Sequence, residues 1–234
     1  MNTYKIADLI VHMNASGRTQ RQAEPYRIAD APEVDFEVFS CAADLHERSP
    51  ELSMDDCEYL STGISFYRQL ARFQGLLLHS SCVVVDERAY LFSAPCGTGK
   101  STHVELWLKL FGDRAYILND DKPALRVIDN EVYVYGTPWS GKHDRSRNMR
   151  VKLGGIAVLE RSEENFIREM TPSEAIFPLL DQTVRTLRAD SMGMCMETLG
   201  KIVELGKVYR LGCNMDQSAA ILSYEFMSGK RFIK

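Results

Sequence analysis

The stretch "APCGTGKS", residues 94–101, combines residue types that can handle phosphate. Backbone N–H groups in such a glycine turn, together with the first free N–H groups of a following helix, can surround a phosphate group. Gly97 and Gly99 permit positive φ angles and a close approach of the backbone. Lys100 can reach the terminal phosphate oxygens of a nucleotide, and the Ser101 hydroxyl can bind Mg²⁺. The spacing therefore predicts a phosphate-binding loop.

One position departs from the usual pattern, because Ala94 stands where such a loop has its first glycine. Pro95 disfavours the helical region for the residue before it, so Ala94 is expected to avoid a positive φ. The alternative interpretation is an ordinary glycine turn before a helix, which needs no ligand. The strand-like segment before the turn and the helical pattern after it favour the phosphate-binding loop.

Two adjacent carboxylates, Asp120 and Asp121, end the apolar segment "AYILNDD" that follows the loop. One carboxylate at a strand end can hold Mg²⁺, directly or through water, and a second can accept a proton from an attacking hydroxyl group. The alternative is a solvated turn before Pro123. His79 interrupts the apolar run "LLLHSSCVVV", either as a hydrogen-bonded structural residue or as a residue close to the loop.

A third feature is the loop-like segment 136–150, which gathers cations after Trp139. Clustered cations on a loop can hold phosphate or stabilise charge on a transferring phosphoryl group. They can equally form a solvated face, and composition leaves both interpretations open. The residues concerned are Lys142, His143, Arg145, Arg147 and Arg150.

These residues need strands and helices to position them. Apolar runs and alternating segments predict hairpins around residues 86–88 and 129–130, and apolar periodicity predicts an amphipathic helix over 55–75. Further strands are expected at 4–13, 34–39, 115–120, 154–161 and 207–213, and helices at 100–110, 173–187, 196–206 and 216–227. Strands mixed with helices and hairpins predict an α/β protein with a mixed sheet and flanking helices. The composition changes near residue 75, because longer apolar segments begin at residue 76. We therefore expect an N-terminal strand-and-helix portion, 1–75, packed on a nucleotide-binding domain, 76–234.

Composition excludes some classes of partner. The 28 basic and 32 acidic residues give a formal charge of −4, which favours neither nucleic acid nor an anionic membrane as a partner. No run approaches the roughly 18 apolar residues of a membrane span, and the first residues lack a signal-peptide pattern, so we expect a cytoplasmic protein. The six cysteines show no CxxC pair, and this indicates neither a zinc site nor a disulfide framework.

The segments "LLHSSCVVV", "APCGTGKST" and "ILNDD", in this order and at this spacing, resemble the P-loop kinase domain of the HPr kinase/phosphorylase-like family. That family is related to the nucleotide-binding core of ATP-dependent phosphoenolpyruvate carboxykinase. The resemblance covers roughly residues 76–160 well and implies a carboxykinase-like P-loop nucleotide-binding fold. The first 75 residues do not resemble the regulatory domain of full-length HPr kinases.

The resemblance also implies roles for single residues. Asp120 would be the base that activates an acceptor hydroxyl group, His79 would lie beside the phosphates with Lys100, and Ser101 and Asp121 would serve the metal. ATP and Mg²⁺ would be the cofactors, the acceptor would be a serine of a protein or peptide, and the family's ring-like oligomers suggest a homo-oligomer. The expected nucleotide contacts are Ala94, Pro95, Cys96, Gly97, Thr98, Gly99, Lys100, Ser101 and Thr102.

Two functions of different classes remain open. The first is a kinase that moves the γ-phosphoryl group of ATP to a hydroxyl group, and the second is a non-catalytic ATP-binding regulatory or maturation module. Asp120 discriminates between them, because only a kinase needs a base at the acceptor hydroxyl. A carboxykinase acting on oxaloacetate is less favoured, because the additional lysine, histidine and arginine residues that it needs are not recognisable in the sequence.

Overall fold

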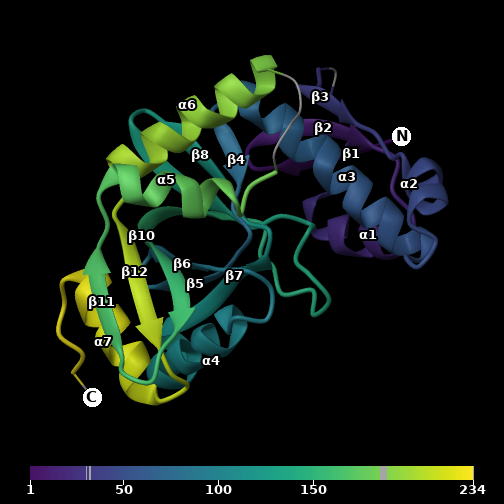
Figure 1. Ribbon diagram of the computed structural model, residues 1–234. Coiled ribbons are helices and arrows are strands. Elements are labelled where there is room, and N and C mark those ends of the chain that lie inside the picture. The colour runs from purple at the N-terminus through teal and green to yellow at the C-terminus, as the bar shows by residue number, and fades with distance from the viewer. Residues whose placement is uncertain (30, 32, 185–188, 234) are drawn as a thin grey trace.

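The computed structural model describes residues 1–29, 31, 33–184 and 189–233. Its main feature is a curled nine-stranded mixed sheet, with a smaller three-stranded sheet at the N-terminal side (Figure 1). The strands of the large sheet are β4 (Gly75–Leu77), β5 (Ser80–Val85), β6 (Arg88–Ser93), β7 (Ala115–Asp121), β8 (Ala124–Ile128), β9 (Glu131–Tyr135), β10 (Arg150–Arg161), β11 (Phe166–Glu169) and β12 (Val208–Cys213).

The strand order in the large sheet is β4-β8-β9-β10-β6-β5-β7, and β12 pairs with both β10 and β11. Strand β10 runs parallel to β6 and to β12, whereas the remaining pairs are antiparallel. The sheet is therefore mixed, as the hairpins and helices of the sequence predicted.

Helices cover both faces of this sheet, which explains the apolar run of residues 82–85 in the second part of β5. Cys82 and Val84 face a cluster that includes α5 and α6, while Val83 and Val85 face one that includes α4 and α7. Successive side chains of a strand point to opposite faces, so a strand covered on both sides is apolar at every position. These helices are α4 (Lys100–Phe111), α5 (Pro172–Leu180), α6 (Ala189–Leu205) and α7 (Gln217–Ser228).

The described residues before β4, here called the N-terminal unit, pack beside β4 and β8 at one edge of the large sheet (Figure 1). One cluster of buried side chains joins the two parts: Tyr59 and Phe66 of the N-terminal unit pack with Ala124, Tyr135 and Trp139. The elements of this unit before β4 are β1 (Asn2–Ile6), β2 (Leu9–Met13), α1 (Gly17–Ala23), β3 (Phe36–Val38), α2 (Ala42–Arg48) and α3 (Met54–Leu70).

Both predicted hairpins of the large sheet are present. Asp86 and Glu87 link β5 to β6, and Asp129 and Asn130 link β8 to β9, all four with positive φ. Two consecutive residues with positive φ form the turn whose twist suits a two-residue hairpin. The strand expected over 4–13 was wrong in one respect, because Ala7 and Asp8 form the same kind of turn and divide it into β1 and β2.

Two other expectations differ from the structure. The polar stretches of the N-terminal unit contain the helices α1 and α2, which were not predicted. The helix expected over 173–187 ends at Leu180, where the chain turns and the Gln182 carbonyl accepts a hydrogen bond from His79 N. Residues 185–187 of that expected helix lie outside the described residues. Within the described residues, no helix combines the length and the apolar character that crossing a membrane requires.

Candidate functional site

The topology brings the three sequence motifs to one edge of the large sheet. Strands β6 and β7 both pair antiparallel with β5, which lies between them. The carboxyl ends of β6 and β7 therefore meet the start of β5 at the same edge. The glycine loop (residues 94–99) follows β6, the aspartate pair ends β7, and His79 precedes β5.

The glycine loop leads from β6 directly into α4. Gly97 has φ +78° and Gly99 has φ +124°, and an added Cβ at either position would meet no atom within 4 Å. Backbone conformation, rather than crowding, therefore requires glycine at both positions. Ala94 is buried and lies outside the positive-φ residues, as predicted. Helix α4 has neither a side-chain cap nor an acidic residue in its first turn, so its free N–H groups face the site.

Lys100 is buried, with 8% of its surface exposed. Its Nζ donates to the Ala94 carbonyl at 2.9 Å and to the Pro95 carbonyl at 3.4 Å. Burial lowers the pKa of Lys100, while the charges of Cys96, Asp121 and Asp120 act in the opposite direction. A desolvated ammonium group tied only to neutral carbonyls would gain from a nearby anion.

Other cations and hydroxyl groups hold the loop in shape. The Arg161 guanidinium, at the end of β10, donates to the Gly97 carbonyl at 2.6 Å and to the Thr98 carbonyl at 3.3 Å. Thr98 Oγ1 donates to the Pro95 carbonyl at 2.9 Å. Because the C=O and N–H of a trans peptide point in opposite directions, carbonyls held by Arg161 direct the following N–H groups the other way. Cys96 is exposed on the loop.

Asp120 lies beside the Ser101 hydroxyl group. Its Oδ1 accepts hydrogen bonds from Ser81 Oγ at 2.5 Å and from Ser101 Oγ at 3.1 Å. The pairing of β5 with β7 places Ser81 directly opposite Asp120, which explains the first contact. Asp120 Oδ2 has no hydrogen-bond partner among the described residues. One carboxylate oxygen is thus fixed while the other can accept a proton or bind a cation.

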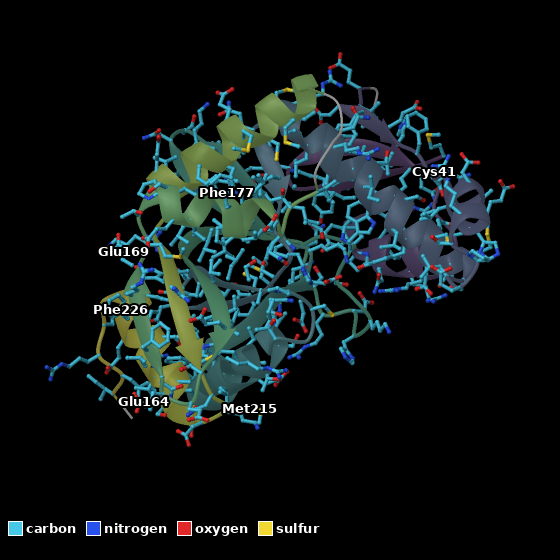
Figure 2. The ribbon with its side chains drawn as sticks, viewed as in Figure 1. Cys41, Glu164, Glu169, Phe177, Met215 and Phe226 are labelled. Atoms are coloured by element: carbon cyan, nitrogen blue, oxygen red, sulfur yellow. The ribbon has the colours of Figure 1, made fainter. Side chains whose placement is uncertain are left out.

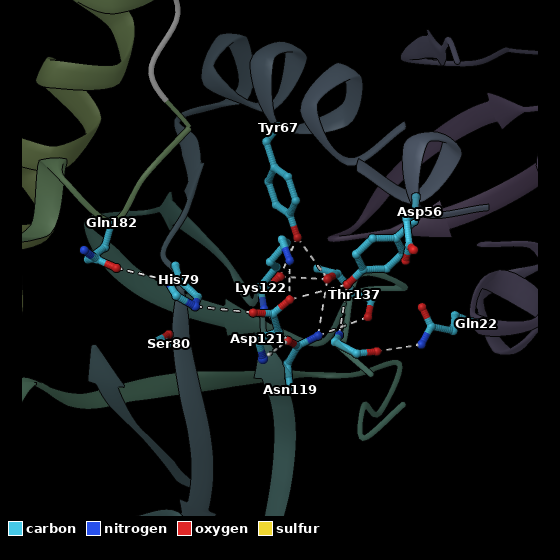
Figure 3. A network of polar contacts seen from close by, with 12 residues as sticks. Gln22, Asp56, Tyr67, His79, Ser80, Asn119, Asp121, Lys122, Thr137 and Gln182 are labelled. Carbon is cyan, nitrogen blue, oxygen red and sulfur yellow. Dashed lines mark hydrogen bonds and ion pairs between the residues drawn. The ribbon is translucent and has the colours of Figure 1, made fainter. Parts of the chain in front are cut away.

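Asp121 is held on both of its oxygens (Figure 3). Oδ1 lies 3.4 Å from His79 Nε2, and Oδ2 pairs with Lys122 Nζ and accepts a hydrogen bond from the Tyr59 hydroxyl at 3.5 Å. These partners come from three places in the chain: His79 just before β5, Lys122 just after β7, and Tyr59 in α3. Asp121 therefore joins three segments at the site.

His79 lies between Asp121 and Gln182 (Figure 3). Its Nδ1 lies 2.9 Å from Gln182 Oε1, opposite the 3.4 Å contact of Nε2 with Asp121. Burial lowers the pKa of His79, and the positive charge of Lys100 lowers it further. The neutral imidazole is therefore favoured, and it donates through only one nitrogen. Its two ring nitrogens face the side-chain oxygens of Gln182 and Asp121.

The basic segment divides into two parts. Arg145 pairs with Glu105, Arg150 pairs with Asp8 at 2.8 Å, and the Arg147 guanidinium lies 4.2 Å from the centre of the Tyr116 ring. These three cations are engaged in structural contacts. Lys142 and His143 are exposed and have no charged or hydrogen-bonding partner among the described residues. Among the described residues of this segment, Lys142 and His143 are therefore the cations whose charge no described contact occupies.

Gly141, in the same segment 136–150, lies close to Asp120 and Asp121. It has φ +76°, and an added Cβ would lie 3.0 Å from the Asp120 carbonyl oxygen and 3.1 Å from Asp121 Cβ. Gly141 N donates to the Tyr59 hydroxyl at 2.9 Å, and Gln22 Nε2 donates to the Gly141 carbonyl at 3.0 Å. The close approach therefore explains glycine at this position.

Sequence reasoning missed five residues of the site: Ser81, Gln182, Arg161, Tyr59 and Gly141. Ser81 lies two residues after His79 and on the same side of the strand, which is a signal that strand alternation could have given. Arg161 ends a predicted strand that runs parallel to β6. Gln182, Tyr59 and Gly141 carried no signal, because only tertiary packing brings them to the aspartate pair.

Two pockets adjoin the glycine loop. The first, about 300 Å³, lies between the loop and the aspartate pair and is lined by His79, Ser81, Lys100 and Ser101 among others. The second, about 620 Å³, lies on the other side of the loop at the carboxyl ends of β10 and β12. Its wall includes Thr102, Leu106, Leu159 and Met215, and Figure 2 shows Met215 at the edge of the molecule. Crevices at the carboxyl ends of strands commonly hold ligands in α/β proteins.

The first pocket offers oxygen ligands suited to Mg²⁺. The Ser101 hydroxyl and the Asp120 and Asp121 carboxylates are hard donors of the kind that this cation prefers. The described residues contain no group of three or more His, Cys, Asp and Glu side chains arranged for a metal ion. A Mg²⁺ ion that also binds phosphate oxygens keeps few protein ligands, so the donor set fits a metal that arrives with a phosphate.

Comparisons with known proteins find only a distant structural similarity. No family model and no curated protein matches this sequence. Among solved structures, the chain is similar to that of the Hpr(Ser) kinase/phosphatase from Coxiella burnetii, with 13% sequence identity and a TM-score of 0.38, over 65% of this chain and 94% of that chain. This is a fold-level resemblance only, and no catalytic activity follows from it.

Proposed function

We propose that this protein is an ATP-dependent kinase of the HPr-kinase-like type, with a carboxykinase-like P-loop fold, that transfers the γ-phosphoryl group to a hydroxyl group. The observation that carries the proposal is the 3.1 Å contact between the Ser101 hydroxyl and Asp120 Oδ1 at the mouth of the glycine loop. It joins a phosphate-binding turn to a carboxylate whose second oxygen has no partner among the described residues.

ATP would occupy both pockets beside the loop. The phosphates fit the pocket of about 300 Å³, where the free N–H groups at the start of α4 and the Lys100 ammonium group are gathered. The nucleoside fits the larger pocket, of about 620 Å³, whose wall includes the apolar side chains of Leu106, Leu159 and Met215. An apolar cleft with a few polar groups at one end suits a base and ribose. The phosphates of the same nucleotide would extend from it into the neighbouring anion site.

In the transfer step, the oxygen of the acceptor hydroxyl group would form a bond to the γ-phosphorus, and the bond to the bridging oxygen of ADP would break. Asp120 Oδ2 would take the hydroxyl proton, while Ser81 and Ser101 hold Oδ1 in place. Lys100 would stabilise the negative charge on the phosphates. His79 would lie beside the phosphates, held between Asp121 and Gln182.

Ser101 and Asp121 would serve the metal. Mg²⁺ bound with ATP would supply positive charge against the phosphates. Ser101 presents its hydroxyl at the start of α4, and Asp121 is kept near by His79, Lys122 and Tyr59.

The acceptor in this proposal is a serine of a protein or peptide, and the protein acts as a homo-oligomer in the cytoplasm. These parts rest on the resemblance of the three motifs to the HPr-kinase-like family. The Asp120 base suits any hydroxyl acceptor, so its identity is a matter for experiment.

A second candidate is a non-catalytic ATP-binding regulatory or maturation module. The observation that favours it is the ion pair between Asp121 and Lys122. With both oxygens already contacted, Asp121 can serve as an internal structural anchor, and such a module needs only the loop and a metal ligand.

The experiment that tests the proposal follows γ-labelled ATP in the presence of Mg²⁺, with serine-containing peptides and cell extract as acceptors. We expect wild type to label a discrete acceptor, and Asp120→Asn to bind ATP with unchanged affinity while its transfer rate falls by about 10² to 10⁴. Asp113→Asn, an exposed acid beyond α4, is the matched control and should transfer normally. Tight ATP binding without transfer to any acceptor or to water would support the binding module instead.

A further inference from the structure

Tyr59 of α3 connects the N-terminal unit to the candidate active site. Its hydroxyl group donates to Asp121 Oδ2 at 3.5 Å and accepts a hydrogen bond from Gly141 N at 2.9 Å. The side chain is buried, with 4% of its surface exposed. One phenol therefore contacts both the metal-side carboxylate and the segment that covers it.

Two cations lie close to the ring of Tyr59. The Arg18 guanidinium lies 3.9 Å from the ring centre, and Lys122 Nζ lies 5.1 Å from it. Arg18 is itself held by Asp56 at 3.3 Å. Contacts between cations and an aromatic face restrict the position of the ring, so the hydroxyl group points to one place.

The phenol keeps its proton. Burial raises the pKa of Tyr59, and the negative charge of Asp121 raises it further. The protonated hydroxyl group donates to Asp121 and accepts from Gly141.

The segment on the other side of Tyr59 is anchored to the same unit. Trp139 is buried, its Nε1 donates to Thr62 Oγ1 at 3.2 Å, and its ring centre lies 4.9 Å from that of Phe66. Two residues later, Gly141 lies against Asp121. Helix α3 therefore contacts this segment through Thr62 and Tyr59, and it contacts Asp121 through Tyr59 as well.

We propose that Tyr59 is a positioning residue for Asp121, and that the N-terminal unit is for this reason a working part of the active site. Its hydroxyl group sets the place of the Asp121 carboxylate relative to Ser101, and it holds Gly141 over the pair. The inference rests on the proposed function, in which Asp121 assists the metal.

The test compares Tyr59→Phe, which keeps the ring, with Tyr135→Phe. The Tyr135 hydroxyl group also donates to a carboxylate, Asp8 Oδ2 at 2.9 Å, but it lies away from the site. The first readout is hydrogen exchange of the Gly141 amide in the ligand-free protein, measured by NMR. Losing its acceptor should speed this exchange about tenfold in Tyr59→Phe only.

The second readout is the Mg²⁺ concentration that gives half-maximal ATP binding by calorimetry. In Tyr59→Phe it should rise several-fold, whereas ATP affinity at saturating Mg²⁺ stays unchanged; Tyr135→Phe should match wild type in both measurements. Should Tyr59→Phe fail to fold, Gly141→Ala replaces it, because its Cβ would press on Asp120 and Asp121 and should raise the same Mg²⁺ midpoint.

Equal Gly141 exchange and equal Mg²⁺ midpoints in Tyr59→Phe and Tyr135→Phe would overturn the inference while leaving the kinase proposal intact. A wild-type protein that binds no ATP would instead overturn the proposed function, and with it the metal role of Asp121. The two failures are therefore distinguishable.

Discussion

The hydroxyl groups of Ser81 and Ser101 lie 3.3 Å apart and both donate to the same oxygen of Asp120. Ser81 belongs to β5, and Ser101 lies in the first turn of α4, so the carboxylate joins the strand to the helix that follows the glycine loop. This arrangement orients Asp120 before any ligand is present, and preorganised groups of this kind lose little freedom when a reaction occurs.

Ser81→Ala removes the strand side of this arrangement. We expect ATP affinity to stay near that of wild type, while the transfer rate falls by about tenfold, because Asp120 loses one donor worth about 1.5–3 kcal/mol as a bond to a charged group. The measurement is steady-state phosphoryl transfer with γ-labelled ATP. Ser80→Ala is the control, because the equally buried Ser80 hydroxyl donates to the Leu78 carbonyl instead. Equal losses in both variants would contradict a specific role for Ser81.

Lys100→Met tests the phosphate pocket. Methionine has a similar length without the charge, so we expect ATP affinity to fall at least about tenfold as charge-assisted hydrogen bonds are lost. The urea midpoint of the ligand-free protein should not decrease, because burial already disfavours the ammonium group. Calorimetry and urea unfolding provide the two values. Lys109→Met, an exposed change on the same helix, should leave both unchanged.

His103 of α4 makes stability depend on pH. Burial lowers its pKa to about 4, below the ordinary value of 6.5, so the unfolded chain binds more protons between these values and stability rises with pH. Its contribution is complete above pH 6.5 and is lost as pH falls toward 4, by up to about 3 kcal/mol. Urea unfolding of wild type and His103→Gln at pH 7 and 4.5 measures the difference.

Glutamine at 103 cannot titrate, so the free energy of unfolding of His103→Gln should fall less than that of wild type over this interval. The exposed change His143→Gln should follow wild type. If all three proteins lose the same stability, His103 is not the group responsible.

Two tryptophans report on the two sides of the molecule. Trp139 lies in the cluster that joins the N-terminal unit to the large sheet, and Trp107 lies in the cluster under α4 and α7. In the single-tryptophan variants Trp107→Phe and Trp139→Phe, we expect urea transitions by fluorescence and by circular dichroism to coincide, with a loss of about 1–3 kcal/mol each. A Trp139 signal that changes at lower urea than circular dichroism would mean that residues 1–75 unfold separately.

Local signals were sufficient for the elements around the loop. The helix predicted over 100–110 is α4, and both predicted hairpins of the large sheet are formed, because glycine, aspartate and asparagine at turns act within a few residues. Helices α1 and α2 were missed because they are short, polar and without apolar periodicity. Helix α1 is held by distant partners: the Arg18 amide donates to Asp55 at 2.8 Å.

In the candidate site, too, local signals identified some residues, while the partners of others depend on distant contacts. The sequence singled out Lys100, Ser101, His79 and the aspartate pair, and the structure brings them to one edge of the sheet. Their roles as ligands and base remain predictions. The basic segment was recognised, but its sequence could not tell that Arg145, Arg147 and Arg150 have structural partners.

The sequence by itself determined the strand, glycine loop and helix over about 89 to 110 and the carboxylates at the end of β7, because backbone conformation and strand patterns depend on near neighbours. Only the tertiary structure decided which groups surround those carboxylates. The pairing of β5 with β7 set Ser81 against Asp120, and the packing of α3 brought Tyr59 and Gly141 to Asp121. Contacts between residues far apart in the chain depend on register and packing, which no local pattern encodes.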